Sequence, residues 1–320
     1  MNTIGHIFKL TTFGESHGVA VGGVIDGCPS QLKLDFGFIE QELFRRKTAQ
    51  SSTSSQRKES DHVEWLSGLL DGVTLGTPIA FMVRNEDCKT EDYEALKDVY
   101  RPSHADFTYE QKYGIRDWRG GGRASARTTL PIVVAGAIAK QILKEKGIQI
   151  MAQVTAMGDV EQARREGDTV GGIVECRIKG VPAGLGEPMF GKFSAELAHA
   201  MFSLPAVKGF EIGDGFVSAK KRGSEANDTF VNKNGKIATL TNHSGGIQGG
   251  ITDGDDIVFR VAFKPIPSIA QPQKTVNRAG ETCQIAIEGR HDVCALPRAV
   301  VLVEALAAMV TLDMAMLHRL

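Results

Sequence analysis

The sequence predicts an α+β fold. Strand-like and helix-like segments come in runs rather than in strict alternation, which is typical of α+β proteins and argues against a doubly wound parallel sheet. The chain has 320 residues, of which 42% are hydrophobic and 23% are charged. This ordinary globular composition is sufficient to bury a sizeable core. Since no internal repeat and no clear linker divides the sequence, we expect one domain over residues 1–320.

The first third of the chain opens with a predicted strand, a loop and a second strand. Phe8 and Leu10 alternate with polar neighbours, and an apolar run at 19–25 follows the loop at 14–18. Apolar spacing then predicts a helix at 36–46, followed by a polar serine-rich mobile loop at 47–61. A short strand at 78–83 and a second helix at 92–99 complete this part of the chain.

The centre of the chain contains one clear helix. Residues 100–127 show no convincing periodicity, but four apolar residues between 132 and 142 share a helical face. Pro131 marks the first turn of this helix and Gly147 its end. Beyond this helix, strands are expected at residues 172–178, at 230–231 paired with 237–238 around an Asn234-Gly235 turn, at 257–263, and at 283–287. A last helix is expected to start near Pro297.

Charge and cysteine usage exclude several classes of protein. A formal net charge of −1 argues against nucleic acid or a membrane as a general partner. The five cysteines lie far apart without a C-x-x-C pair, which favours reduced thiols over a disulfide framework or a zinc site, so we expect no metal. The N-terminus lacks a signal-peptide pattern, and Glu304 and Asp313 interrupt the most apolar segment, so we expect a buried helix and a cytoplasmic location.

The first candidate site is the segment Gly14-Glu15-Ser16-His17-Gly18. A histidine between small residues in a strand-connecting loop can donate a proton to a departing phosphate, because its pKa lies near neutrality. The alternative is a histidine that only bonds a loop carbonyl. Motifs of P-loop kinases, Rossmann dehydrogenases and zincins are not found in the sequence.

The second candidate site extends over residues 100–127, which hold six basic and three acidic residues. Three glycines at 120–122 leave backbone N–H groups open, and Arg123 and Arg127 precede a helix. Together these features predict an anion site. A solvated basic face is the alternative, but it does not explain three glycines beside serine and arginine. A third segment, 289–292, places charged residues before a buried helix and suits either a capping network or a ligand contact.

Together these segments resemble the chorismate synthase family. Its three signatures occur in order, GESHGVAVGGVIDGCP at 14–29, GGGRASAR at 120–127 and GRHDVCALPRAVVLVEA at 289–305. Four matching segments stand between them: RPSHADFTYEQKYGIRD at 101–117, VPAGLGEP at 181–188, AVKGFEIGDGF at 206–216 and NHSGGIQGGITDG at 242–254. The resemblance covers nearly the whole chain.

The resemblance implies a carbon–oxygen lyase of the shikimate pathway. Such an enzyme converts 5-enolpyruvylshikimate 3-phosphate to chorismate and phosphate by 1,4-anti elimination, with reduced FMN and no net redox change. It also implies a β-α-β sandwich, with a helical layer between antiparallel sheets, and a homotetramer. Some family members reduce their own flavin with NADPH, but no separate reductase domain is evident here, so we expect an external flavin reductase or reductant.

The resemblance also implies roles for individual residues. His17 would protonate the leaving phosphate, His104 would stabilise or protonate the reduced flavin, and Asp292, aided by Ser16 and Ser125, would take the substrate proton through flavin N5. The substrate's anionic groups would be held by Arg45, Arg46 and Arg127. The FMN site would be lined by Arg123, Ala124, Ser125, Ala206, Gly249, Lys264, Pro265, Ile266, Pro267, Ser268 and Arg290.

Some positions depart from the family pattern. The usual R-R-R-P-G with a later arginine is replaced by Arg45-Arg46-Lys47-Thr48-Ala49, with Ser52 where that arginine would stand. Ala124 and Thr128 replace a frequent serine and glutamate, and Ile266 and Pro267 replace frequent hydroxyl residues. A catalytically impaired FMN- or metabolite-binding paralogue is therefore one alternative, and an unrelated phosphate-binding structural protein is another.

Overall fold

The structure is a computed structural model that describes residues 1–47, 60–86, 90–233, 235–287 and 292–318. Most of the serine-rich segment, together with Asn234 and Arg290, lies outside these residues, so the predictions made for them have no structural counterpart.

The first sheet has five strands in the order β1-β2-β3-β7-β4. Every neighbouring pair in this sheet is antiparallel. The strands are β1 (Thr3–Ile4), β2 (Lys9–Phe13), β3 (Ala20–Asp26), β7 (Ile79–Arg84) and β4 (Glu64–Trp65). A small hairpin of β5 (Leu69–Leu70) and β6 (Val73–Thr74) flanks them. The predicted strand–loop–strand at the start of the chain is confirmed by β2 and β3.

The second sheet has four antiparallel strands in the order β10-β15-β9-β8. They are β10 (Val207–Ile212), β15 (Ile257–Phe263), β9 (Gly172–Lys179) and β8 (Gln149–Met157). The inward residues of β15 are fully or almost fully buried and alternate with partly exposed ones, as expected for a sheet with one covered face. Three hairpins extend from this half of the protein: β11 (Phe230–Lys233) with β12 (Lys236–Thr239), β13 (Ile247–Gln248) with β14 (Ile251–Thr252), and β16 (Gln273–Val276) with β17 (Thr282–Ile285).

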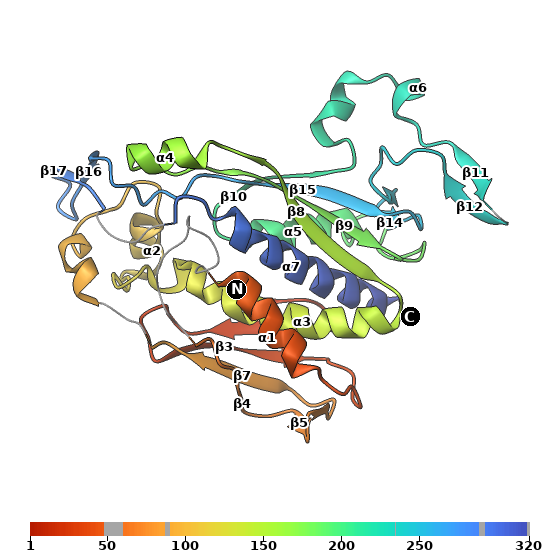
Figure 1. The fold of residues 1–320 in the computed structure, drawn as a ribbon, viewed down its shortest axis with the longest axis horizontal. Coiled ribbons are helices and arrows are strands. Elements are labelled where there is room, and N and C mark those ends of the chain that lie inside the picture. Colours follow the sequence, from red (N-terminus) through yellow and green to blue (C-terminus); the bar gives the residue numbers. More distant parts are fainter. Residues whose placement is uncertain (48–59, 87–89, 234, 288–291, 319–320) are drawn as a thin grey trace.

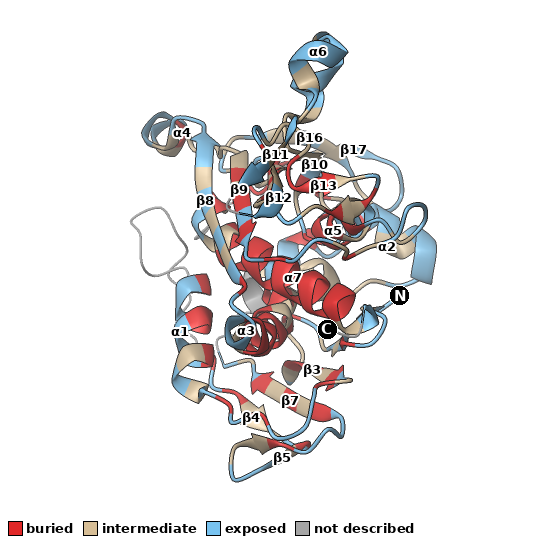
Figure 2. Ribbon diagram, turned by 90° about the vertical axis from the view of Figure 1, so that its right-hand side faces the viewer, coloured by how far each residue is buried: buried red, intermediate tan, exposed pale blue. Residues whose placement is uncertain are grey.

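A layer of helices separates the two sheets (Figure 1). It contains α1 (Phe36–Arg46), α3 (Leu130–Glu145), α5 (Phe193–Phe202) and α7 (Leu296–Leu317). Gly136 of α3 lies directly against α7, because a Cβ added there would be 2.3 Å from the Ala305 Cβ. One cluster of buried apolar side chains runs through both sheets and this layer, which Figure 2 shows as a buried centre at α3 and α7. The expected β-α-β sandwich is confirmed.

Helix α7 is long and apolar enough to cross a membrane by length and composition, but 83% of its most apolar window is buried inside the protein. It is the core helix that the sequence predicted. Its two carboxylates fix other elements. Glu304 bonds the Arg45 guanidinium, with contacts at 2.7 and 2.9 Å, and also Lys140 of α3 at 2.6 Å.

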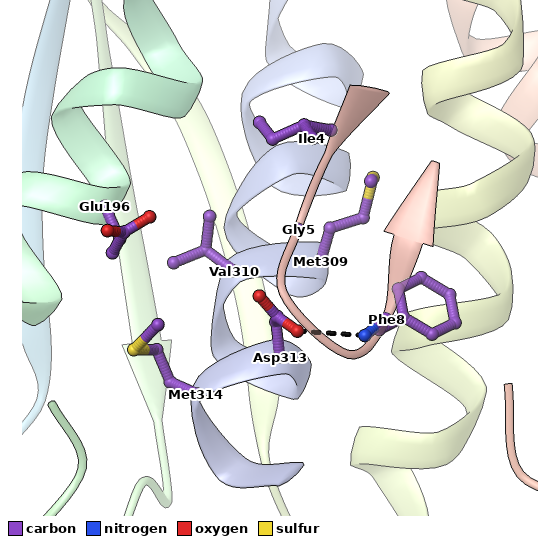
Figure 3. Close-up of a pocket in the computed structure, with 8 residues that line it drawn as sticks. All are labelled: Ile4, Gly5, Phe8, Glu196, Met309, Val310, Asp313 and Met314. Carbon is purple, nitrogen blue, oxygen red and sulfur yellow. Dashed lines mark hydrogen bonds between the residues drawn. The ribbon is translucent and has the colours of Figure 1, made fainter. Parts of the chain in front are cut away.

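The second carboxylate, Asp313, holds the turn that connects β1 to β2 (Figure 3). It accepts hydrogen bonds from the backbone N–H groups of His6, Ile7 and Phe8 at 2.7, 2.7 and 2.9 Å. The Asp313 residue is only 3% exposed. Since an ionised carboxylate that accepts several backbone N–H bonds is a strong anchor, the N-terminal strands are attached to the core helix.

The structure also contains elements that the sequence analysis did not predict. Helix α2 (Asp106–Tyr113) lies in the region without periodicity, and α4 (Val160–Glu166) and α6 (Gly223–Ala226) are short. The helix expected at 92–99 is a 3-10 helix over Thr90–Leu96. Helix α2 escaped prediction because its one buried residue is Asp106, which forms ion pairs instead of joining an apolar stripe.

Candidate active site

The loop between β2 and β3 packs against the glycine triplet at 120–122. The Ser16 N–H donates to the Gly122 carbonyl at 3.3 Å, and the Ser16 hydroxyl donates to the Gly120 carbonyl at 3.1 Å. The same hydroxyl lies 3.3 Å from Nδ1 of His17, and the His17 ring meets the Tyr93 ring edge-on at 5.2 Å. Two segments about a hundred residues apart therefore fix one imidazole.

The glycine triplet is required by this close packing. Gly120 has a φ of +58°, and a Cβ added there would lie 2.0 Å from Nδ1 of His17. Only glycine fits both the conformation and the space. The Arg123 side chain continues the contact, because it donates to the Gly14 carbonyl at 3.2 Å and to the Thr12 hydroxyl at 2.7 Å. Ala124 follows in a short 3-10 turn.

Ser125 begins the next 3-10 turn, where its hydroxyl accepts from the Arg127 N–H at 3.4 Å. The Arg127 side chain pairs with the Asp61 carboxylate, whose other oxygen lies 3.8 Å from Nη1 of Arg46. All three side chains are 5% exposed or less. Asp61 also has a φ of +52°, an uncommon conformation for an aspartate. It is the last residue of the predicted serine-rich loop at 47–61, where no sequence pattern identified it as a partner of two arginines.

Arg45 lies in a different environment from Arg46. Its guanidinium bonds Glu42 at 2.6 Å and Glu304 at two atoms, and the hydrogen bond to Glu304 raises the pKa of Arg45. These contacts place Arg45 in the ion network between α1, α3 and α7. The structure does not bring it to Arg127, so a structural role explains its contacts.

His104 sits in a short turn that begins with Arg101. Its Nδ1 lies 3.1 Å from the Pro102 carbonyl and its Nε2 lies 3.0 Å from the Ser268 hydroxyl. A carbonyl can only accept, so Nδ1 carries the proton, and in the neutral ring Nε2 accepts from Ser268. Burial and then the Arg101 charge lower the pKa of His104 to about 4. The ring is therefore neutral at physiological pH.

The Arg101 guanidinium connects the His104 turn to the glycine triplet. It is bonded to Asp106 at 2.8 Å through both Nε and Nη2, and its Nη2 would lie 3.7 Å from a Cβ at Gly121. Burial alone would raise the pKa of Asp106, but the hydrogen bonds and charge of Arg101 lower it. The pair therefore stays ionised, beside both the His104 turn and the glycine triplet.

The segment 264–268 closes the His104 side of the site. The Lys264 N–H donates to the Ala206 carbonyl at 2.9 Å, and the Lys264 ammonium donates to the Ser103 carbonyl at 2.9 Å. Burial, followed by the nearby Lys208 charge, lowers the pKa of Lys264. Pro265 and Pro267 alternate with Ile266 and Ser268 along this stretch.

Asp292 precedes α7 and forms an ion pair with Arg298 in the first turns of that helix. The next residue, Val293, accepts the Val170 N–H at 2.9 Å, and the neighbouring Thr169 hydroxyl donates to the Ile266 carbonyl at 2.6 Å. These bonds attach the Asp292 segment to the 264–268 segment. The carboxylate is buried, with the residue 8% exposed.

Gly249 lies apart from this group in the described part of the chain. It follows β13 and lines a groove with residues that include Asp228, Ser244 and Gln248. Its φ is +63° and a Cβ there would meet no atom within 4 Å. Arg290 lies outside the described residues, and among those described no group of three or more His, Cys, Asp or Glu side chains could hold a metal ion.

The arrangement joins two histidines, several arginines and a lysine to hydroxyl and backbone donors on an α+β scaffold. Donors of this kind fit an anionic cofactor and a multiply anionic substrate, because each negative group can meet a cation or an N–H. The fold and the site thus define an enzyme of small anionic metabolites.

Comparisons with known proteins agree with this class. The chorismate synthase family model matches residues 8–164 and 157–316. A chorismate synthase of Parabacteroides distasonis is 51% identical over 353 aligned positions, covering 100% of this chain and 99% of that protein. One from Porphyromonas gingivalis is 51% identical, covering 98% and 95%. A crystal structure of chorismate synthase aligns with a TM-score of 0.78 at 28% identity, covering 98% and 93% of the two chains. This chain belongs to the chorismate synthase family, whose members are lyases of the shikimate pathway.

Proposed function

We propose that this protein converts 5-enolpyruvylshikimate 3-phosphate to chorismate and phosphate by 1,4-anti elimination, with reduced FMN bound. The observation that carries the proposal is the family match over residues 8–316, and the family resemblance makes His17, His104 and Asp292 the candidate catalytic residues. Nothing in the described residues or in the comparisons favours a catalytically impaired paralogue.

His17 is the proposed acid for the departing phosphate. Its ring contacts Tyr93 edge-on and bonds the Ser16 hydroxyl, which is itself held by the Gly120 carbonyl, so the imidazole is oriented before substrate binds. A positioned acid of this kind removes the charge that develops on the leaving oxygen. Arg46 and Arg127 supply fixed positive charge for the substrate's anionic groups.

His104 and Asp292 are proposed to act beside the cofactor. Reduced FMN would supply electron density for loss of phosphate, which amino acid side chains cannot provide. His104 keeps a proton at Nδ1 on the Pro102 carbonyl and holds Nε2 toward Ser268. The Asp292 carboxylate is held by Arg298 and is proposed to accept the substrate proton beside the cofactor site, with Ser16 and Ser125 assisting.

The residues present fit an FMN ligand by their chemistry. The Lys264 ammonium can donate to a phosphate or a ring carbonyl, and the Ser268 hydroxyl, which donates to His104, can accept from a ring N–H. Ala206 and the prolines at 265 and 267 would pack along the ligand, while Gly249, which lies apart from them, and Arg290 remain predictions from the family resemblance. NADPH would serve only as an indirect reductant through an external flavin reductase.

The wider assembly is proposed to be a cytoplasmic homotetramer of single-domain chains. Its support is a set of exposed apolar side chains on and beside the arm that carries α6, β11 and β12, which extends away from the helical layer in Figure 1. Phe216, Ile237 and Leu240 on and beside this arm are 79%, 81% and 66% exposed. Large apolar side chains exposed to this extent are expected where a surface contacts another protein.

An anaerobic assay with dithionite-reduced FMN and the enolpyruvyl substrate tests the function. Chorismate absorbance should rise with reduced FMN in only catalytic amounts, because the elimination consumes no electrons. His17→Ala and His104→Ala should each lower turnover by roughly 10²–10⁴-fold, the usual range for loss of a positioned acid or base. Equal product with oxidised flavin, or a stop after one equivalent of reductant, would refute the proposed mechanism.

A further inference from the structure

Asn85 follows β7, and its side chain joins two parts of the site that are far apart in sequence. The Asn85 Nδ2 donates to the Glu15 carbonyl at 3.0 Å and to the Gly18 carbonyl at 2.8 Å. Its Oδ1 accepts from Nε of Arg127 at 2.9 Å. Carbonyls only accept and guanidinium only donates, so these partners fix which way the amide faces. Both amide hydrogens are used.

The two carbonyls lie on either side of Ser16 and His17. The Gly18 N–H donates back to the Glu15 carbonyl at 3.1 Å, and this bond closes the turn that carries the imidazole. Backbone pairing of the Asn85 N–H with the Val19 carbonyl at 3.1 Å holds the end of the same turn. Asn85 therefore supports the His17 turn from one side, while the glycine triplet supports it from the other.

At its other end, Asn85 helps to fix the Arg127 guanidinium. Each nitrogen of this group has a different partner: Nε bonds Asn85, Nη1 pairs with Asp61, and Nη2 donates to the Arg84 carbonyl at 3.1 Å. A planar guanidinium held at three nitrogens has little freedom to rotate. Through one amide, its position is coupled to that of the His17 turn.

We propose that Asn85 is a positioning residue that sets the distance and orientation between the His17 imidazole and the Arg127 guanidinium. The inference rests on the proposed function, in which an acid and a fixed cation must meet different anionic groups of one substrate. Small errors in such a spacing are costly, since a misplacement of about 1 Å can lower a rate on the order of 100-fold.

Two substitutions separate positioning from general support of the fold. Asn85→Asp keeps an acceptor for Arg127 but replaces both N–H donors with oxygen, which repels the Glu15 and Gly18 carbonyls. Asn85→Ala removes both connections. Asn2→Ala is the matched control, because Asn2 is exposed and its Oδ1 lies 3.5 Å from Nη2 of Arg123, so it also removes an asparagine beside an arginine.

Steady-state kinetics of the full chain with reduced FMN should then divide the two effects. Asn85→Asp should lower kcat by about 10- to 100-fold while KM stays within about threefold of wild type. Asn85→Ala should lower kcat and also raise KM by about 10- to 100-fold, the loss expected for one hydrogen bond to a charged group. Asn2→Ala should match the wild type in both parameters.

Hydrogen–deuterium exchange supplies a readout that does not need activity. Peptides covering 14–20 should exchange faster in Asn85→Asp than in wild type and Asn2→Ala. The Glu15 carbonyl, which accepts from the Gly18 N–H, is no longer held by Asn85 in that variant. Wild-type exchange in that segment, or equal kinetic losses in the Asp and Ala variants, would overturn the inference. If the wild-type protein makes no chorismate, the proposed function fails, while the exchange result still decides whether Asn85 holds the turn.

Discussion

The Asp61 carboxylate lies against the Arg127 guanidinium in the protein interior, with 3% and 5% of the two side chains exposed. The second oxygen of Asp61 lies 3.8 Å from Arg46, so one internal anion faces two arginines. Like charges brought together away from water repel strongly unless an opposite charge lies between them. Asp61 therefore allows two cations to remain close in the folded chain.

Replacing Asp61 should be far more damaging than replacing a surface carboxylate. Asp61→Asn should lower the free energy of unfolding by about 3 kcal/mol, because it leaves buried charge without its counterion. The control is Glu64→Gln, which removes an exposed pair with Arg84 at 2.6 Å and should cost less than about 1 kcal/mol. Urea unfolding followed by circular dichroism measures both. Equal losses would show that the buried pair is not specially important.

Gly120→Ala should impair catalysis through His17. The added Cβ would lie 2.0 Å from Nδ1 of His17 in a backbone with φ +58°. Gly147→Ala is the matched control, since Gly147 has a φ of +76° and no atom within 4 Å of the new Cβ. Both variants should lose about 1 kcal/mol of stability from the left-handed conformation. Only Gly120→Ala should also lose turnover, by about 100-fold. Equal turnover in the two variants would contradict the proposal that the Gly120 backbone sets the position of the His17 imidazole.

The lowered pKa of His104 makes a prediction for the pH dependence of stability. Burial and then the Arg101 charge lower the folded-state pKa of His104 from its ordinary value of 6.5 to about 4. Between these values the unfolded chain binds a proton that the folded chain does not, so the contribution is full above pH 6.5 and is lost as pH falls toward 4.

Wild type should therefore lose more unfolding free energy between pH 7 and pH 5 than His104→Gln does. His62→Gln replaces an exposed histidine and should keep the wild-type slope. Chemical unfolding at the two pH values gives the comparison, and NMR titration of the His104 ring gives its pKa directly. A wild-type slope in His104→Gln would contradict the neutral, buried ring.

Asp313→Asn should loosen the turn between β1 and β2. The carboxylate accepts three backbone N–H groups, and an amide would turn its own N–H₂ toward at least one of them. The expected loss is about 2–4 kcal/mol, since hydrogen bonds to charged groups are the strong ones. Asp26→Asn is the control, because Asp26 accepts one backbone N–H at the surface, at 2.9 Å. Thermal unfolding should separate the two variants; a loss in Asp313→Asn no larger than in the control would show that the anchor contributes little.

Local periodicity was sufficient to predict much of the fold. In several elements the spacing of apolar residues within one segment is enough to identify the helix or strand. They are the helices at 36–46 and after Pro131, the strand at 257–263 and the buried C-terminal helix. The signatures around His17, the glycine triplet and Asp292 likewise identified the family, because they are continuous in sequence.

Only the tertiary structure decided which charges pair. Arg45 and Arg46 are neighbours in sequence, yet one bonds Glu304 in the core network and the other faces Asp61. Adjacent residues on a helix point about 100° apart, so each meets a different element. The same holds for buried Asp106 of helix α2 and for the amide of Asn85. Their partners are chosen by how distant segments pack, and no pattern within one segment encodes that choice.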